Sequence, residues 1–368
     1  MQISKEEDAE LERQLKILNK FPVKTIHTEW GDIIDCIDIH KQPAFDHPSL
    51  KNHKIQVPTH ILFSFFIEHE PSNFMFDGIE CLEGTVPIRR TTKEDLIRAK
   101  SFSKTKNSAT NEQKINSAYI NGAYINLEDD DKRTKYFGAS ANITTYNPNV
   151  GEDQFSAAQI WIESSFRPTP FNSIQAGWIV APPLYKDHLT RIFTYWTGTG
   201  SPVTGCYNTL CPGFVQVDRG LYPTLPIDHI STYGGIQYYV NIAVNQDKSS
   251  GDWWLSIAGT KNIGYWPKAL FNSLGEGADS IKWGGSVSLS EEGISPPMGS
   301  GHFPDGHPKH SCYFTQIMYV NDHYELVNLG DTAYKEILCP RYGLTITGYV
   351  EEQGNTIEVG GPGGNCTR

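Results

Sequence analysis

The sequence predicts a mainly β protein in which a small α+β region precedes an antiparallel β-sandwich of two sheets. The 368 residues include 33 glycines and 22 prolines, a turn-rich composition that is typical of many short strands. Segments rich in β-branched and aromatic residues recur at short intervals beyond residue 118, which favours two packed antiparallel sheets over βαβ units. Because a chain of this length exceeds one typical core, we expect one small and one larger domain.

The small region is expected to begin with a helix. Ser4 and Glu7 have the spacing of a capping box, and three leucines then recur at helical intervals, so residues 5–20 are predicted to form one amphipathic helix that packs on a small sheet. Strands bounded by Pro and Asp turns are expected at residues 32–39 and 60–67.

A polar stretch over residues 91–116 separates the two regions. Its sequence, TTKEDLIRAKSFSKTKNSATNEQKIN, is basic and contains too few apolar residues to fold alone. We interpret it as a linker, and an exposed linker of this kind would be open to proteolysis. The alternative is an ordinary surface loop.

The larger region carries the signals of a sandwich. Turn residues punctuate a series of strand-like segments, which lie at residues 154–163, 173–180, 191–196, 235–245, 253–258 and 344–350. One further helix is expected near residues 267–274.

Charge and hydropathy exclude two classes of partner. A formal net charge of −11 without a basic stripe argues against binding to nucleic acid. No apolar run is long enough to span a bilayer, so no membrane insertion is expected. The N-terminal sequence is acidic and helical, so we expect a signal peptide to be absent or already removed.

The seven cysteines favour disulfides over a metal site. They form no CxxC pair and match no zinc-ribbon spacing; they are Cys36, Cys81, Cys206, Cys211, Cys312, Cys339 and Cys366. Sequons at Asn142 and Asn365 point in the same direction, towards a glycosylated protein of an oxidising compartment. We expect glycosylation at Asn142, and neither a bound metal nor a cofactor.

Ordered motifs along the whole chain resemble one known family. They are GDIIDCIDIHKQPAFDHPSLKNHKIQ (31–56), GTVPIRRTTKEDLIRA (84–99), GCYNTLCPGFVQVD (205–218), GYWPKALFNSL (264–274), WGGSVSL (283–289) and MGSGHF (298–303). Together they are similar to the activation peptide and the mature domain of the neprosin family, whose members include plant glutamic endopeptidases that cleave after proline.

The resemblance implies an organisation for this chain. It implies an activation-peptide-like pro-domain over residues 1–95, bound intramolecularly, then a linker over residues 96–117 and a peptidase-like β-sandwich over residues 118–368. It also implies a secreted plant glycoprotein of the cell wall, vacuole or extracellular space, with acid-triggered removal of the pro-domain. The implied disulfides are Cys36–Cys81, Cys206–Cys211 and Cys339–Cys366, and Cys312 is left unpaired.

The two catalytic glutamates that the resemblance implies are replaced. Gln175 stands in the motif IQAGW, and Ser286 stands in the motif WGGSV, where the family has glutamates. A carboxylate pair hydrolyses a peptide when one member activates water and the other acts as an acid. Because Gln175 cannot exchange a proton, it is limited to holding an oxyanion, so conventional peptidase activity is disfavoured.

Three functions follow from this loss. The first is a non-proteolytic enzyme that reuses the cleft for plant specialised metabolism, in a cyclisation, condensation or lyase step on a small molecule. The second is a non-catalytic binder of proline-rich peptides or cell-wall proteins. The third is an acid endopeptidase that works through a relocated carboxylate, and Glu163 is the candidate because it shares a strand face with Gln159 and Trp161; the alternative for Glu163 is a solvent-facing strand end.

Aromatic residues supply the candidate binding surface. Most of the tryptophans are expected in the core, whereas the residues assigned to substrate binding are Trp161, Trp178, Tyr207 and His302. His302 belongs to the family motif, while His307 and His310 fit no zinc signature and are interpreted as loop residues.

Overall fold

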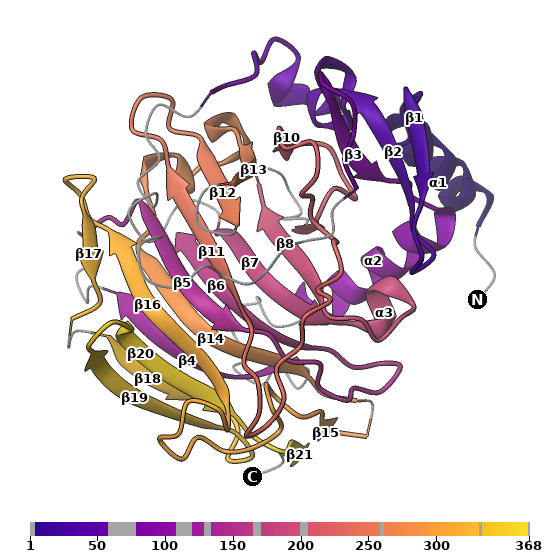
Figure 1. The fold of residues 1–368 in the computed structure, drawn as a ribbon. Helices are drawn as coiled ribbons and strands as arrows, with labels where there is room; N and C mark the ends of the chain where they lie inside the picture. Colours follow the sequence, from indigo (N-terminus) through magenta and orange to yellow (C-terminus); the bar gives the residue numbers. More distant parts are fainter. Residues whose placement is uncertain are drawn as a thin grey trace.

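The chain folds into two packed β-sheets with a smaller N-terminal region at one edge (Figure 1). The computed structural model describes residues 4–57, 79–107, 120–128, 134–164, 171–198, 205–257, 261–290, 292–330 and 333–366. The strand predicted at residues 60–67 lies outside the described residues. Among the described residues, antiparallel pairing accounts for every named strand pair.

One sheet of the sandwich contains seven strands within the described part of the chain. In spatial order they are β18 (Tyr334–Ile337), β4 (Ile120–Glu128), β14 (Ser280–Ser288), β6 (Ser156–Ser164), β7 (Asn172–Val180), β8 (Arg191–Thr197) and β9 (Gly205–Tyr207). Strands β6, β7 and β8 match the strands predicted at residues 154–163, 173–180 and 191–196.

The second sheet contains nine strands among the residues described. In order they are β10 (Val215–Gln216), β13 (Lys261–Trp266), β12 (Trp253–Ile257), β11 (Tyr239–Gln246), β5 (Gly138–Thr144), β16 (Cys312–Val320), β20 (Gly354–Gly360) and β19 (Gly343–Val350), with β17 (Leu326–Asn328) paired to β16. A short ribbon of β15 (Ile294–Ser295) and β21 (Gly364–Asn365) lies beside the sandwich.

Tryptophans join the two sheets through the core. Trp178 of β7 donates its indole N–H to the carbonyl oxygen of Thr144 on β5 at 2.9 Å. Trp283 of β14 makes the corresponding bond to the carbonyl oxygen of Ser140 at 3.2 Å. Both rings are fully buried, and each buried indole N–H therefore has the partner that it needs. These bonds fix which side of the seven-stranded sheet faces the core.

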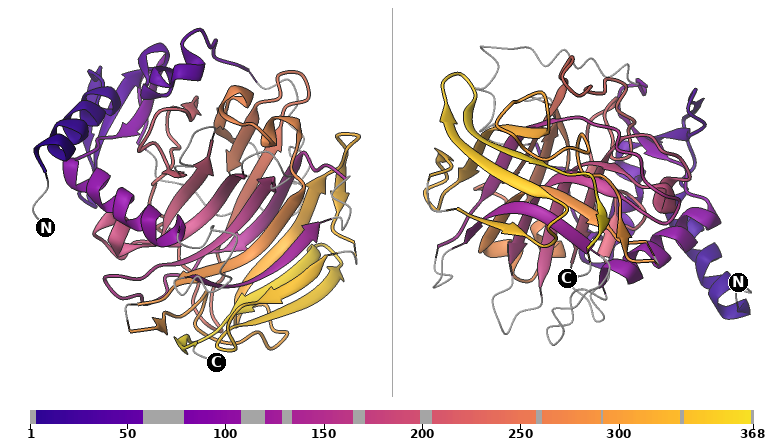
Figure 2. Two further views of the ribbon diagram at one scale, coloured as in Figure 1. Left: turned by 180° about the vertical axis from the view of Figure 1, so that it is seen from behind. Right: turned by 90° about the horizontal axis from the view of Figure 1, so that it is seen from below.

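The N-terminal region, residues 4–107, contains helix α1 (Lys5–Leu18) and a three-stranded sheet of β1 (Lys24–His27), β2 (Ile33–Asp38) and β3 (Thr85–Arg89). The predicted helix and the strand predicted at residues 32–39 are confirmed. Ser4 caps α1 by accepting a hydrogen bond from the backbone N–H of Glu7. Figure 2 shows this region at one edge of the sandwich in both views.

Helix α2 (Lys93–Asn107) occupies most of the stretch that we predicted as a linker. The prediction of an unstructured segment is wrong for these residues, because Thr92 and Asp95 cap the helix reciprocally and two apolar side chains, Leu96 and Phe102, are buried against neighbouring elements. The remainder of the stretch lies outside the described residues, and the proposed domain boundaries stay predictions.

Short 3₁₀ turns complete the N-terminal region and the loops. They are η1 (Ile39–Lys41), η2 (Pro43–Asp46), η3 (Pro48–Leu50), η5 (Lys268–Leu270) and η6 (Leu274–Glu276), together with the single-turn helix α3 (Pro182–Tyr185). The helix predicted at residues 267–274 is wrong, because the chain there makes two separate 3₁₀ turns, η5 and η6.

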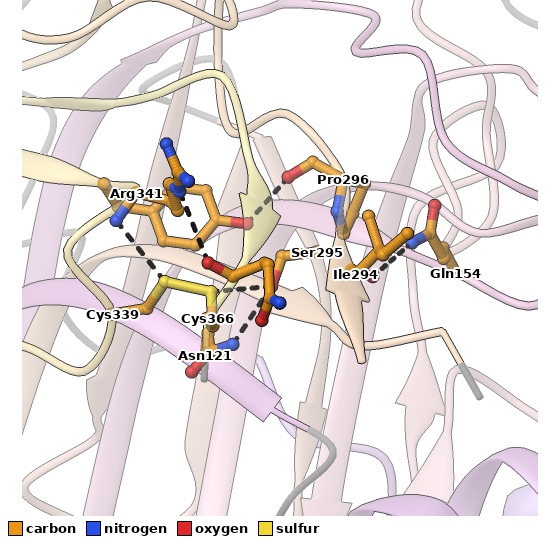
Figure 3. Close-up of a disulfide and its surroundings, with 10 residues drawn as sticks. Asn121, Gln154, Ile294, Ser295, Pro296, Cys339, Arg341 and Cys366 are labelled. Carbon is orange, nitrogen blue, oxygen red and sulfur yellow. Dashed lines mark hydrogen bonds between the residues drawn. A yellow bond between two sulfur atoms is a disulfide. The ribbon is translucent and has the colours of Figure 1, made fainter. Parts of the chain in front are cut away.

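The three disulfides are those that the family resemblance implies: Cys36–Cys81, Cys206–Cys211 and Cys339–Cys366. Cys312 is a buried free thiol. The bond Cys339–Cys366 ties the C-terminal segment to the loop before β19, and Cys366 Sγ lies 3.0 Å from the hydroxyl of Ser295 on β15 (Figure 3).

Asn142 lies on a central strand rather than on a loop. Its side-chain oxygen accepts a hydrogen bond from Asn241 of the neighbouring strand at 2.8 Å, and its glycosylation stays a prediction. Across the described residues, no helix is long and apolar enough to cross a membrane.

Candidate functional site

The candidate site is the outer face of the seven-stranded sheet, the side turned away from the core. Because side chains alternate along a strand, the residues next to Trp178 and Trp283 point outwards. The outer face is thus built from β6, β7 and β14, and its central residues are Gln159, Trp161, Glu163, Ser173, Gln175, Lys282 and Ser286.

Gln175 and Ser286 flank the middle of this face without contacting each other as neighbours. Gln175 pairs with Trp161 on β6, and Trp161 pairs with Lys282 on β14. Ser286 stands four residues beyond Lys282 (286 − 282) and pairs instead with Ala157. Both side chains are only 6% exposed. Gln175 and Ser286 therefore share a face and are separated by strand β6.

A chain of hydrogen bonds leads from Gln175 to Glu163. The amide nitrogen of Gln159 donates to Oε1 of Gln175 at 3.0 Å. Gln175 in turn donates through Nε2 to the hydroxyl of Ser173 at 3.2 Å, and that hydroxyl donates to Oε1 of Glu163 at 3.4 Å. Glu163 is thus connected to Gln175 through one hydroxyl.

Lys282 holds the other oxygen of Glu163. Its Nζ lies 2.9 Å from Oε2 of Glu163, and the two side chains are 21% and 12% exposed. Burial by itself would lower the pKa of Lys282, but the Glu163 carboxylate beside it outweighs this effect and raises the pKa above its usual value. Lys282 therefore carries its positive charge on the outer face throughout the physiological pH range.

Tyr124 extends this polar group across the sheet. The Lys282 ammonium lies 5.3 Å from the centre of the Tyr124 ring, within the range of a cation–π contact. The Tyr124 hydroxyl donates to Oε2 of Glu336 at 2.9 Å. Burial, opposed in part by Lys282, raises the pKa of Tyr124, so that its phenol stays protonated.

Aromatic rings stand on both sides of Gln175. On one side, Trp161 pairs with Gln175, and its ring centre lies 5.6 Å from that of Tyr124. On the other side, Tyr195 pairs with Gln175, and its ring lies 4.7 Å from that of Tyr207. This arrangement is typical of a binding site, in which a few polar groups are set between apolar walls.

The structure separates the four residues predicted to bind substrate. Trp161 and Tyr207 lie on the outer face with Gln175, as described above. Trp178 packs in the core between the sheets. Side chains alternate along β7, so Trp178 points to the opposite side from Gln175 and does not line the site. The His302 ring is tilted against that of Tyr233, with ring centres 4.0 Å apart, in a loop cluster that also contains His307 and His310.

Several residues of the site were missed from the sequence. Lys282, Tyr124 and Ser173 contribute its charge and its hydrogen bonds, yet no motif pointed to them. The period of two along β7 and β14 was the available signal, because it places Ser173 with Gln175 and Lys282 with Ser286. In the part of the chain that is described, no group of three or more His, Cys, Asp or Glu side chains is arranged to hold a metal ion.

The N-terminal region covers the Ser286 end of the outer face. Phe102 of α2 belongs to a buried cluster with Ala157, Ile179 and Phe193. At the same end, the Arg191 guanidinium donates to Asp32 of the N-terminal region at 2.7 Å. Glu163 lies at the other end of the same strands, so the covered end and the charged end of the face are distinct.

Comparisons with known proteins place this chain in a family. The neprosin family model matches residues 152–362, and the model of the neprosin activation peptide matches residues 25–134. Among solved structures, a scytalido-glutamic peptidase with a transition-state analogue inhibitor is similar at 11% identity and a TM-score of 0.35, over 65% of this chain and 97% of that chain.

Two further structures show weaker likeness of fold. SCP-B, a member of the eqolisin family of peptidases, has 12% identity and a TM-score of 0.33, over 66% of this chain and 96% of its own. A glycoside hydrolase family 16 endo-glucanase from Bacteroides ovatus has 13% identity and a TM-score of 0.28, over 46% of this chain and 66% of its own. Because the neprosin model alone spans more than half of the 368 residues, this chain belongs to the neprosin family.

Proposed function

We propose that this chain is an enzyme that uses the outer face for proton transfer on a small organic substrate, and that it is not a conventional glutamic endopeptidase. One observation carries the proposal: Glu163, a carboxylate, is linked through Ser173 to Gln175 and is paired with the Lys282 ammonium. The face thus combines a base, a fixed positive charge and an amide, and it lacks carboxylates at the two family positions.

The chemistry follows from the state of each group. The Glu163 carboxylate accepts a proton from a C–H or O–H bond of the substrate, and the electron pair of that bond stays on the substrate. The negative charge that develops on a substrate oxygen is stabilised by the Lys282 ammonium and by the amide of Gln175. Glu163 then returns the proton at another atom or to a departing group. This sequence suits a cyclisation, a condensation or a lyase reaction.

Peptide hydrolysis is less well served by the same groups. Glu163 would have to activate water and then protonate the departing amine by itself, because the raised pKa values of Lys282 and Tyr124 make both poor acids. Gln175 and Ser286 cannot serve as that acid, since neither an amide nor an alcohol titrates in the accessible range.

An acid endopeptidase that works through Glu163 is the second candidate. It is favoured by the chain Gln175–Ser173–Glu163, because it joins an amide and a carboxylate through a single hydroxyl. In this case Glu163 would activate water, and Gln175 would bind the carbonyl oxygen of the peptide.

The cellular setting is part of the proposal. Three disulfides suit an oxidising compartment, and we propose that the protein is a secreted glycoprotein of plant specialised metabolism. We further propose that the N-terminal region acts as a pro-domain, which is released by cleavage in the segment between α2 and β4.

The test uses a simple probe of carboxylate bases, nitrobenzisoxazole. A base removes its ring C–H proton, the nitrogen–oxygen bond breaks, and a coloured phenolate is released. The full chain is assayed before and after limited proteolysis of the predicted linker, beside the variants Glu163→Gln and Glu276→Gln. Glu276 is the matched control, because it is a carboxylate paired with Lys268 on the surface.

The expected result is phenolate release by the wild type and by Glu276→Gln, with a loss of about 10²- to 10⁴-fold in Glu163→Gln, the range for removal of a general base. Equal rates in all three proteins, before and after proteolysis, would remove Glu163 from the proposed role. Cleavage of proline-containing peptides by the wild type, lost in Glu163→Gln, would instead establish the second candidate.

A further inference from the structure

Strand β19 is an edge of the nine-stranded sheet that carries none of the usual protection of an edge. The strand orders of the two sheets end at β9, β18, β10 and β19. Strands β9 and β10 contact the N-terminal region, through α2 and η2 respectively, and β18 carries Lys335 and Glu336. Strand β19, with the sequence GLTITGYV, contains no charged residue and no proline, which are the residues that normally prevent an edge from meeting another chain. Among the described residues, its backbone pairs with β20 alone.

Large apolar side chains are exposed along this edge. Ile346 and Tyr349 of β19 are 48% and 70% exposed. Strand β18 lies beside β19 at the same rim of the sandwich (Figure 1). It ends at Ile337, which is 38% exposed, and Leu338 follows with 46% exposed. We call these four residues the rim patch. Contiguous apolar patches on a protein surface mark interaction sites, whereas single exposed apolar residues do not.

The position of the rim patch leaves it free of the N-terminal region. Figure 1 shows β18 and β19 on one side of the molecule and α1 with its three-stranded sheet on the other. A β-bulge between Ile346 and Gly348 interrupts the pairing of β19 with β20, and a bulge disrupts a regular ladder of backbone hydrogen bonds. A partner on this edge therefore meets side chains in the first place.

The two ends of β19 carry charges of opposite sign. Arg341 stands two residues before the strand, and Glu352 stands two residues after it, next to Glu351. All three residues are exposed. A two-fold axis through the middle of β19 exchanges the two ends of the strand, so it brings Arg341 of one copy to the partner's Glu352. A two-fold contact needs a surface that is complementary to itself in this way.

We propose that the rim patch is a self-association surface, and that its partner is a second copy of this chain, related by a two-fold axis at the middle of β19. Ile346 and Tyr349 of the two copies pack around the axis, where they lose exposed apolar area. The two pairs of Arg341 and Glu352 fix the orientation, because strands that ran in the same direction would bring like charges together. This proposal does not depend on the proposed function.

Sedimentation velocity of the full chain between about 1 and 100 µM measures the association. We expect the mass to move from that of one chain towards that of two over this range. Ile346→Lys and Tyr349→Lys each place a charge in the contact and should weaken the dimer at least about tenfold. The matched control is Phe21→Lys, which changes an exposed apolar residue of the N-terminal region and should leave the association unchanged. All three positions are exposed, and circular dichroism checks that each variant is folded.

Exchange of the two charges tests the symmetry of the contact. Arg341→Glu or Glu352→Arg alone should weaken the dimer by about fivefold, because like charges then face each other twice across the axis. The double variant Arg341→Glu/Glu352→Arg should restore the dimer, and the two positions lie at opposite ends of β19 within one copy, so this rescue reports a contact between copies. Glu276→Arg, an exposed position away from the rim, is the charge control. A chain that stays monomeric, a dimer that Ile346→Lys and Tyr349→Lys leave intact, or a double variant as weak as the single ones would overturn the proposal.

Discussion

Lys282 Nζ lies 2.9 Å from Oε2 of Glu163, although 119 residues separate the two in the sequence. Strands β14 and β6 are neighbours, and Lys282 pairs with Trp161, two positions before Glu163. The result is a mostly buried ion pair on the face where the family resemblance implies two acidic side chains. The site thus holds a carboxylate beside an ammonium group, which distinguishes it from a pair of neighbouring carboxyls.

Removal of Lys282 should destabilise the fold. Lys282→Met leaves the Glu163 carboxylate mostly buried without its cation, which costs about 3 kcal/mol of unfolding free energy for a buried pair. Urea denaturation measures the change. The matched control is Lys268→Met, whose exposed pair with Glu276 should be worth less than about 1 kcal/mol. Equal midpoints for the two variants would show that the Glu163 ion pair stabilises the fold no more than the exposed pair does.

The sequence was sufficient for the architecture but not for the site. Strands such as β6 and β7 were visible because β-branched and aromatic residues lie between turn signals. Helix α2 was missed because its stability depends on burial of Phe102 against distant strands, which local composition does not report. Trp178 was misplaced because its motif was considered without the alternation that turns it to the core. The contact between Lys282 and Glu163 depends on strand order, which no local pattern encodes.

Docking of the N-terminal region should weaken as pH falls through the histidine range. The Nε2 atom of His53, a residue of this region, lies 2.8 Å from the Tyr265 hydroxyl. Burial lowers the pKa of His53 below 6.5. The docked state therefore prefers the neutral ring. The stability that neutral His53 gives to docking is fully present above pH 6.5. It is lost as pH falls from 6.5 towards the lower pKa that His53 has in the docked state.

Hydrogen exchange of the N-terminal region between about pH 7 and 5 tests this prediction. His53→Gln should flatten the pH dependence over this interval. The control is His323→Gln, an exposed position whose substitution should leave the dependence intact. An unchanged profile in His53→Gln would exclude this residue as the source.

A second loss of docking is expected at lower pH, at the start of α2. Burial opposes ionisation of Asp95, but Arg89 and the hydrogen bonds from Thr92 outweigh it and hold the pKa of Asp95 below 3.8. The stability that this carboxylate contributes is present above pH 3.8 and is lost as pH falls through its lower folded value. Asp95→Asn should lower the free energy of unfolding by about 1 kcal/mol at neutral pH, as for a lost helix cap. Unfolding followed by circular dichroism at several pH values should then no longer show the loss of stability in acid. A variant that keeps the full acid step would contradict the assignment.

The buried ion pair between Arg191 and Asp32 should anchor the N-terminal region. The two side chains are 1% and 5% exposed, and their atoms lie 2.7 Å apart. Arg191→Met leaves the Asp32 carboxylate buried with one cation fewer, and we expect a loss of about 3 kcal/mol. Native-state hydrogen exchange of helix α2 should accelerate. Arg13→Met, which breaks an exposed pair with Glu10, is the control and should change little.

Introducing the two glutamates that the family resemblance implies tests whether the face is a peptidase scaffold. The double variant Gln175→Glu/Ser286→Glu places carboxylates on both sides of β6, and we expect it to cleave proline-containing peptides in acid, where one carboxyl is protonated and the other ionised. Either single variant should remain inactive. An inert double variant that folds and unfolds like the wild type would show that the cleft has changed beyond these two residues.

The most direct test of the central claim is an assay of peptide hydrolysis. The wild-type chain is treated to cleave the linker and incubated with a proline-containing peptide at about pH 2.5 to 5, and mass spectrometry detects any product. Because neither Gln175 nor Ser286 titrates and Glu163 is paired with Lys282, the account predicts no product above the background of a heat-inactivated sample. Steady cleavage after proline that disappears in Glu163→Gln would contradict it and would make this protein a peptidase with a relocated carboxylate.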